Sequence, residues 1–397
     1  MTEPSRPARL HSLTGLRFFA AVIVFLHHVT ISFPFPFAPF ADRGLASGLG
    51  RGLEKAGWLG VSFFFVLSGF VLAWSAARGG DTAAGFWRRR LVRVFPSHAV
   101  TWALAMLLFA GASTPLWSSL PNLLLLQPWS ADPRVHFGVN SPSWSLGAEV
   151  FFYLLFPLLI GLVRRIRPGA LRGWALAMGG GVIAVQLVAQ FVLTTGAAPY
   201  DAPVTGWQFW FGYAFPPARL FEFTLGLLLA RLLREGLLPR VGVPAAALGL
   251  AAGYALATAV PWLNALTALM IVPVAALICA VAARDVEGVP TVLRGRTLRR
   301  LGEVSFGFYL AHYVVIHWVR VELMDGRLLG TAAGAALICG LFVASLAAGA
   351  LLMVAVERPA VRRWSRPRRA LPEAKPPQHP QPQEHPESPR QPEGRLA

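Results

Sequence analysis

The first apolar run of the chain carries the residues best suited to chemistry. It reads LTGLRFFAAVIVFLHHVTISF, with Arg17 near its start and the adjacent His27 and His28 beyond its middle. An ionisable side chain in hydrocarbon is costly, so it normally faces a protein interior or a wet cavity. In a helix, eleven residues return to nearly the same direction and rise about 16 Å, so Arg17 and His28 share one face. One extended ligand would reach both, and His28 is suited to proton transfer near neutral pH.

The composition is that of a multi-pass membrane protein. Of 397 residues, 55% are hydrophobic and only 14% are charged, which excludes an ordinary soluble domain. The net charge of +17 would suit nucleic-acid binding, but the arginines stand in short clusters between apolar runs, so we expect no nucleic-acid partner. The two cysteines, Cys279 and Cys339, lie in apolar runs and predict neither a disulfide framework nor a metal site.

Apolar segments long enough to span a bilayer predict an all-α bundle of about ten transmembrane helices. They are Leu16–Phe33, Gly57–Ala76, Phe95–Ala112, Trp144–Val163, Trp174–Thr195, Pro216–Leu233, Val241–Val260, Trp262–Ala283, Val304–Glu322 and Thr331–Val356. One set of alternate connections holds 25 lysines and arginines and the other holds 5. Positive charge favours the cytoplasmic side, so we expect both termini in the cytoplasm and the protein in the cell (plasma) membrane.

Three domains are expected along the chain. Residues 1–13 form a cytoplasmic N-terminal segment, and residues 14–363 form the transmembrane domain. Residues 364–397 are rich in Pro, Gln, Glu and His and cannot bury enough apolar surface to fold, so we expect a disordered cytoplasmic tail.

On this topology, four ionisable side chains fall at one depth in the outer half of the membrane: His28, Glu149, Arg219 and Glu222. Unpaired charges there are very costly, so we expect them to pair around a polar cavity. The alternative is a structural ion pair that locks helices together, since Arg219 and Glu222 stand i,i+3 and can satisfy each other. His312, in the middle of the ninth segment, fits a hydrogen bond within the bundle better than a reactive role.

The cytoplasmic side offers a basic segment with two interpretations. Phe86–Pro96 reads FWRRRLVRVFP, which suits an interfacial helix that extends its arginines toward anionic lipid. It equally suits a phosphate clamp, because the guanidinium fork matches phosphate oxygens. In the second apolar segment, Ser68 and Gly69 permit close helix packing or the passage of a slim ligand.

These segments together resemble the acyltransferase-3 family of membrane O-acyltransferases over roughly Leu13–Pro359. Seven strings in the same order carry the resemblance: GLRFFAAVIVFLHH, GVSFFFVLSGF, FWRRRLVRVFP, WSLGAEVFFYLLFP, RLFEFTLG, LGEVSFGFYLAH and ERP. Two positions depart from the family pattern, because Thr14 and Ser62 stand where members often have Asp. This puts local ion pairing near the N-terminus in doubt.

The resemblance implies transfer of an acyl group from acyl-CoA to a hydroxyl, with acyl-CoA as donor substrate and no tightly bound cofactor. It implies that His28 is the essential histidine, Arg17 its basic partner, and Arg90 and Arg93 the R-x-x-R pair on the cytoplasmic side. We expect no hydrolase-like domain after the membrane part, so the chain is similar to free-standing members that acylate glycans or secreted natural products.

We therefore expect an O-acyltransferase that moves an acetyl or other short acyl group to a hydroxyl-bearing glycan or small molecule. In this hypothesis His28 is the general base, Glu149 orients it, and Arg219 or Arg17 stabilises the oxyanion. The donor contacts Arg17, Arg90, Arg93, Ser68 and Gly69, while Arg219, Glu222 and His312 contact the acceptor.

Two alternatives remain at this point. Direct transfer is favoured over an acyl-histidine intermediate, without excluding it. A polytopic transporter or lipid or glycan flippase would also bury ionisable groups, but its usual internal repeat or paired broken helices are not evident.

Overall fold

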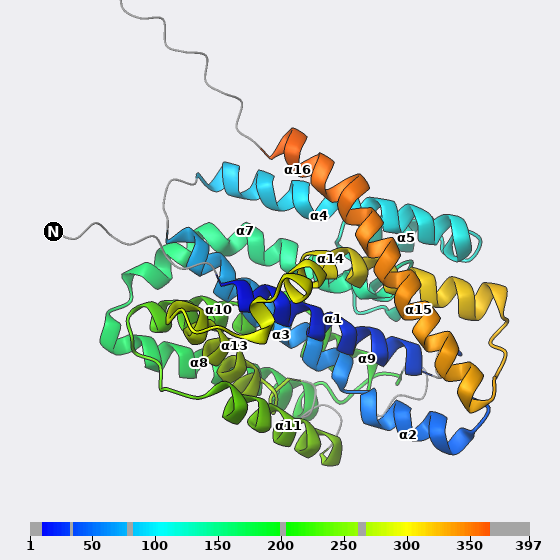
Figure 1. Cartoon of the computed structure of the whole chain (residues 1–397), viewed down its shortest axis with the longest axis horizontal. Helices are drawn as coiled ribbons and strands as arrows, with labels where there is room; N and C mark the ends of the chain where they lie inside the picture. The colour runs from blue at the N-terminus through cyan, green and yellow to red at the C-terminus, as the bar shows by residue number, and fades with distance from the viewer. Residues whose placement is uncertain (1–9, 32–34, 78–81, 199–203, 261–266, 366–397) are drawn as a thin grey trace, which may run out of the picture.

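The computed structural model describes residues 10–31, 35–77, 82–198, 204–260 and 267–365. Within these ranges the chain is almost entirely helical (Figure 1). The helices of at least 16 residues are α1 (His11–Thr30), α3 (Ala56–Ala76), α4 (Ala83–Ala105), α7 (Trp144–Arg165), α8 (Leu171–Phe191), α10 (Pro216–Arg234), α11 (Val243–Ala259), α13 (Ile271–Val286), α14 (Arg296–His317) and α15 (Thr331–Leu352). The shorter helices are α2 (Arg43–Leu53), α5 (Leu116–Leu123), α6 (Pro133–His136), α9 (Gly206–Phe209) and α16 (Arg358–Trp364).

Each of the ten predicted apolar segments overlaps one of these long helices. Six helical stretches in the described ranges are long and apolar enough to cross a membrane, so the chain is a multi-pass membrane protein. The count of ten spans and the cytoplasmic location of the termini stay predictions. Helix α1 begins at His11, inside the segment 1–13 expected to precede the bundle. The predicted disordered tail lies almost wholly outside the described residues.

Helix α1 lies at the centre of the bundle, between α3 and α14 (Figure 1). Its first turn is held by Asp285 of α13, whose carboxylate accepts the Ser12 backbone N–H at 2.7 Å and the Ser12 hydroxyl at 2.8 Å. These bonds satisfy donors that a helix N-terminus leaves free. The helix that carries Arg17 and His28 is therefore fixed at its start and along two faces.

Two glycines bring α3 and α10 into backbone contact. A Cβ atom at Gly69 would collide with the Phe223 carbonyl, and one at Gly226 would collide with the Val66 carbonyl. Small residues allow membrane helices to approach closely and gain dispersion contacts. Gly69 therefore allows close helix packing, which is one of the two roles expected from its sequence position.

Four π-helical segments interrupt the regular helices in the described ranges: η1 (Met106–Ala110), η6 (Trp210–Ala214), η8 (Trp318–Leu323) and η9 (Met353–Glu357). A π turn shifts the side chains that follow it, and such turns are frequent at functional sites. Three of these segments supply residues to the cavity described below.

Short elements cover the end of the bundle where α1 terminates, which we name the His28 end; the opposite end is the Arg17 end. They are α2, α5, α6 and the 3₁₀ turns η2 (Gln127–Trp129) and η3 (Ser141–Ser143); the other 3₁₀ turns are η4 (Pro168–Ala170) and η7 (Val292–Arg294). Buried amides hold the covering segment, since Asn140 donates to the Leu310 carbonyl at 3.1 Å and Asn122 to the Val135 carbonyl at 2.8 Å. Irregular backbone at such depth needs these partners.

Candidate functional site

A cavity of about 1100 Å³ lies at the His28 end. Its wall is rich in aromatic side chains from α3, α7, α9, α14, η1, η6 and the connecting segments: Phe35, Phe37, Trp58, Phe109, Phe137, Trp144, Phe209, Tyr213, Tyr309 and Tyr313. The charged lining residues Arg43, Arg51, Glu54, Arg134 and Glu322 are all at least partly exposed. The cavity therefore joins an apolar, aromatic interior to a charged opening, and it is large enough for a drug-sized molecule.

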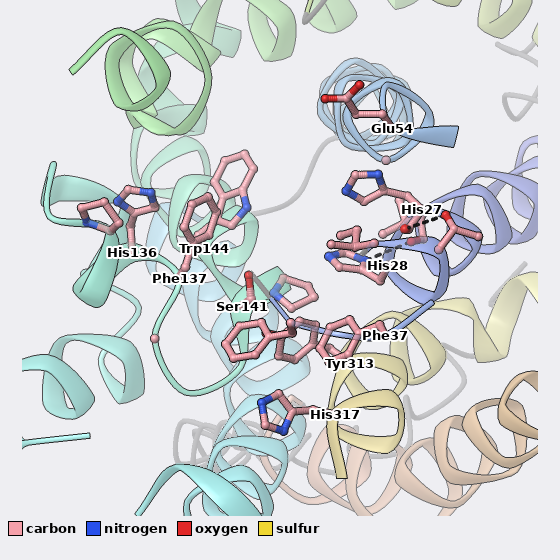
Figure 2. A pocket seen from close by; sticks show the side chains of 18 of the residues that line it. His27, His28, Phe37, Glu54, His136, Phe137, Ser141, Trp144, Tyr313 and His317 are labelled. Carbon is pink, nitrogen blue, oxygen red and sulfur yellow. Dashed lines mark hydrogen bonds between the residues drawn. The ribbon is translucent and has the colours of Figure 1, made fainter. Parts of the chain in front are cut away.

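His28 lies on the wall of this cavity. Figure 2 shows His27, His28 and Tyr313 along one side of the pocket, with Trp144 and His136 across from them. The Nδ1 atom of His28 is 2.9 Å from the Val24 carbonyl oxygen and 3.1 Å from Nε2 of His312. The hydrogen bond within the bundle that was predicted for His312 is therefore made with His28.

His27 turns away from His28 toward α3. Its Nδ1 lies 3.2 Å from the Leu53 carbonyl, and its ring occupies the space where a Cβ at position 57 would stand, because that residue is Gly57. The two imidazole rings are edge to face, with centroids 5.0 Å apart. His27 therefore packs the backbone of α3 while His28 faces α14.

A buried arginine fixes the wall beside His28. Arg320 of η8 is fully buried and donates to the carbonyls of Phe37 at 2.9 Å and Arg327 at 2.8 Å, and to those of Pro36, Ala38 and Gly326 at 3.2 to 3.3 Å. These bonds join the segment after α1 to the turn before α15. Phe37 consequently packs edge to face on Tyr313, with ring centroids 5.5 Å apart, and Tyr313 packs likewise on His28 at 5.6 Å.

The opposite wall is held by aromatic stacking. Tyr213 of η6 contacts the rings of Trp144 and Trp58, with centroids 5.0 and 5.7 Å apart. His136 of α6 stacks on Phe209 at 6.0 Å. Burial lowers the pKa of His136 to about 4, so this imidazole is neutral near pH 7 and adds no charge to the wall.

Arg219 and Glu222 form a closed ion pair behind this wall. The guanidinium Nη2 lies 2.9 Å from the Glu222 carboxylate and donates to the Ser62 hydroxyl at 3.0 Å, and both charged side chains are at most 2% exposed. The rings of Phe65 and Tyr213 lie against the guanidinium, 5.1 and 4.9 Å from its carbon. Neither charged residue lines the cavity, which supports the structural interpretation of the pair over acceptor binding. Ser62, one of the two departures from the family pattern, thus contacts this pair.

The structure corrects the predicted position of Glu149. Its carboxylate accepts a hydrogen bond from the Tyr153 hydroxyl at 2.8 Å and lies within electrostatic range of Arg17, Arg90 and Arg93. It therefore belongs to the Arg17 end and not to the level of His28. His312 takes the place that was expected for Glu149 as the hydrogen-bond partner of His28.

The Arg17 end holds a second polar cluster, the arginine cluster, formed by Arg17, Arg90, Arg93, Glu149, Tyr153 and Glu357. Arg93 of α4 pairs with Glu357 of η9 at 3.2 Å, so the basic string FWRRRLVRVFP meets the closing ERP string. Ser68 is close enough to hydrogen-bond Tyr153. Ser68 therefore borders this cluster, whereas its neighbour Gly69 packs on α10.

Tyr309 and Ser145 lie beside the inner wall of the cavity. The Tyr309 hydroxyl is 2.8 Å from the Ser145 hydroxyl and 3.1 Å from the Pro142 carbonyl. Tyr309 lines the cavity, and Glu149 of the arginine cluster is within its electrostatic range. The cavity lining includes His28 but neither Arg17 nor Arg219; their role in stabilising an oxyanion stays a prediction.

Several cavity residues have no signal in the local sequence pattern. Tyr313, His317 and His136 line the cavity, but each looks like a packing residue when the chain is taken segment by segment. Arg320, which supports the cavity wall without lining it, does have a sequence signal: it is an arginine within the ninth apolar segment, and an intramembrane charge needs partners. Among the described residues, no group of three or more His, Cys, Asp or Glu side chains is arranged to hold a metal ion.

Comparison with known proteins gives a consistent result. A family described as an acyltransferase domain matches residues 10–354. The acyltransferase MdmB of Streptomyces mycarofaciens is 41% identical over 92% of this chain and 95% of its own length. The exopolysaccharide production protein ExoZ of Rhizobium meliloti is 27% identical over 77% of this chain and 90% of its own.

A more distant relative, the O-acetyltransferase OatA of Staphylococcus aureus, is 26% identical over 41% of this chain and 26% of its own length. No solved structure matches the chain. The family match covers most of the protein, including both ends of α1 and the α14 segment with His312. The chain belongs to the acyltransferase-3 family and is a membrane O-acyltransferase.

Proposed function

We propose that the protein transfers a short acyl group from acyl-CoA to a hydroxyl of a carbohydrate or a natural product, with His28 as general base. The observation that carries this proposal is the place of His28, a histidine on the wall of a large aromatic cavity, with Nδ1 engaged by protein atoms. Its second nitrogen is then left for the acceptor. A positioned base of this kind contributes about 10²–10⁴-fold to the rate.

In the proposed reaction, Nε2 of His28 takes the proton of the acceptor hydroxyl as the oxygen attacks the thioester carbonyl. The new C–O bond forms and the C–S bond breaks. The CoA thiolate leaves and takes the proton back from His28, so the histidine returns to its neutral state. Direct transfer of this kind needs no acyl-enzyme.

The donor is proposed to enter from the Arg17 end. Arg17, Arg90 and Arg93 gather there, and guanidinium groups suit the phosphates of coenzyme A. Arg17 and His28 stand about 16 Å apart along one face of α1, a separation that the thin pantetheine arm would bridge. The arm would pass Ser68 and then Tyr309, which borders the cavity.

The acceptor is proposed to occupy the cavity at the His28 end. Its aromatic walls suit the apolar faces of sugar rings or of other hydroxylated ring systems. With the predicted orientation this end faces away from the cytoplasm, so donor and acceptor would approach from opposite sides. A transporter has no support from the comparisons, because the family and the relatives carry acyltransferase names.

The test uses purified protein in nanodiscs with acetyl-CoA and a set of alkyl glycosides and hydroxylated polyketides as acceptors. We expect thiol release and a matching acetylated product by mass spectrometry, and a loss of at least about 100-fold in kcat for His28→Ala. His98→Ala is the matched control, because His98 is buried in α4 and bonds the Asn122 carbonyl outside the cavity.

Full activity of His28→Ala at normal expression would remove the general-base assignment. Intact acetyl-CoA with every acceptor would exclude acetyl-CoA as donor under this proposal, and uptake of an acceptor without thiol release would favour transport.

A further inference from the structure

We propose that His312 is a positioning residue that fixes the tautomer of His28, so that Nε2 of His28 is the unprotonated nitrogen. This inference rests on the proposed function of His28 as the base. It assigns His312 to the histidine it contacts, in place of the acceptor contact expected from sequence.

The proton positions follow from the acceptors around the two rings. Nδ1 of His28 lies 2.9 Å from the Val24 carbonyl, and a carbonyl only accepts, so Nδ1 must carry the proton. Nε2 of His312, 3.1 Å from that nitrogen, then accepts from it. The proton of His312 stands on its own Nδ1, which lies 3.3 Å from the Phe308 carbonyl. The carbonyls of Val24 and Phe308 thus independently require the same placement of protons on the two imidazole rings.

Packing holds His312 in the position that this arrangement needs. The residue is fully buried. Its ring stacks on Phe308 with centroids 6.0 Å apart and meets Phe25 edge to face at 6.4 Å. The ring is therefore confined by its neighbours, and its acceptor nitrogen is in place before any substrate binds.

A neutral imidazole is a suitable partner in this position. When His28 takes the acceptor proton, its Nδ1–H belongs to a cation and its hydrogen bonds strengthen. A carboxylate would stabilise that cation more, but it would be a buried charge in the resting enzyme, at a high desolvation cost. The imidazole pair is uncharged at rest and carries one charge only during transfer.

The titratable groups that face this pair are few. His27 neighbours His28 on α1, and Glu54 lies beyond His27 (Figure 2). From α14, Tyr313 meets the ring of His28 and Tyr309 the ring of His312, with centroids 5.6 and 5.7 Å apart. The α3 surface near His28 contributes Gly57, Trp58 and Val61 to the same cavity, and none of these titrates.

The test uses diethyl pyrocarbonate, which acylates unprotonated imidazole nitrogen, so it needs no knowledge of the natural acceptor. The modification of His28 is followed by mass spectrometry against pH in the full-length protein. In His312→Phe, which keeps an aromatic ring but removes the acceptor, we expect the pH midpoint to fall by about one unit or more. His312→Gln supplies an oxygen at similar reach and should restore the midpoint at least in part.

A packing role alone would lower the thermal stability of His312→Phe and leave the pH midpoint of His28 modification unchanged, and this result would overturn the proposal. His98→Phe serves as the matched control, since it removes another buried histidine and should not move the midpoint. Failure of the proposed function is recognised separately, by full acetyl-transfer activity in His28→Ala.

A second measurement decides the matter if His312→Phe does not fold. In wild-type protein with ¹⁵N-labelled histidine, the His28 signals are identified by their loss in His28→Ala. Protonated Nδ1 and unprotonated Nε2 in His28, with a scalar coupling across the hydrogen bond from Nδ1 to a second histidine nitrogen, supports the proposal. The reverse tautomer, or the absence of that coupling, contradicts it.

Discussion

Two pairs of ionisable residues inside the bundle differ in what surrounds them. His28 and His312 meet on the wall of a cavity of about 1100 Å³. Arg219 and Glu222 meet at 2.9 Å within solid packing, with two aromatic rings against the guanidinium. The first pair is uncharged at rest and has one nitrogen available to a ligand. The second is charged and its partners are all protein groups, so burial of ionisable side chains does not by itself identify the reactive ones.

The largest effect on stability is expected from breaking the charged pair on one side. Glu222→Leu leaves the Arg219 guanidinium buried without its carboxylate, and this group stays charged at any ordinary pH. We expect a loss of about 3–5 kcal/mol in the free energy of unfolding, measured by thermal or chemical denaturation in detergent.

The double variant Arg219→Met with Glu222→Leu should recover most of that loss, because the uncompensated charge is gone. If the double variant is as unstable as Glu222→Leu, or if the folded protein loses acyl transfer, the pair has a role beyond holding helices together.

The arginine cluster differs from the Arg219–Glu222 pair, because its charges are expected to contact a substrate. Arg90→Gln should raise the KM for acetyl-CoA about tenfold, the effect of one hydrogen bond to a charged group. Acetyl-pantetheine lacks the nucleotide phosphates and is the matched donor, so its KM should stay the same. An equal rise for both donors would show that Arg90 acts on the fold and not on the phosphates.

A smaller loss of stability is expected from a substitution at Arg320, which links the cavity wall to the turn before α15. Arg320→Lys keeps the charge but has three donors where five carbonyls now accept. We expect a loss of about 1–3 kcal/mol in stability and a few-fold rise in acceptor KM, with no change in the KM for acetyl-CoA.

Arg327→Lys is the control for Arg320→Lys. It makes the same exchange on an exposed side chain of the same turn and leaves the Arg327 carbonyl in place. Equal behaviour of the two variants would contradict a special role of Arg320 in shaping the wall.

The sequence predicts the helices well because each apolar run is bounded by arginine clusters or by Pro and Gly. It also predicts the common face of Arg17 and His28, since both lie on one uninterrupted helix. It does not predict the contact of His28 with His312, because 284 residues separate them and helical periodicity does not say which helices become neighbours.

The position of Glu149 shows a second limit. Alternating charge gives the direction in which a helix crosses the membrane, but not its tilt or its offset from neighbours. Glu149 consequently lies with Arg17 and not with His28. The π segments add a third limit, because they displace residues such as Tyr213 and Glu357 from the 3.6-residue period.

The absence of a side chain at Gly57 makes this position sterically sensitive for the wall that carries His27 and His28. The imidazole of His27 fills the place of the missing methyl group, so the conversion of one hydrogen to a methyl group, Gly57→Ala, would push that ring aside. Because His27 precedes His28 directly, the displacement would pass through a single peptide unit to the His28 imidazole, the proposed base. Gly57→Ala would thereby lower the rate of the proposed reaction without altering any residue assigned to it, and natural variation at position 57 should be correspondingly narrow.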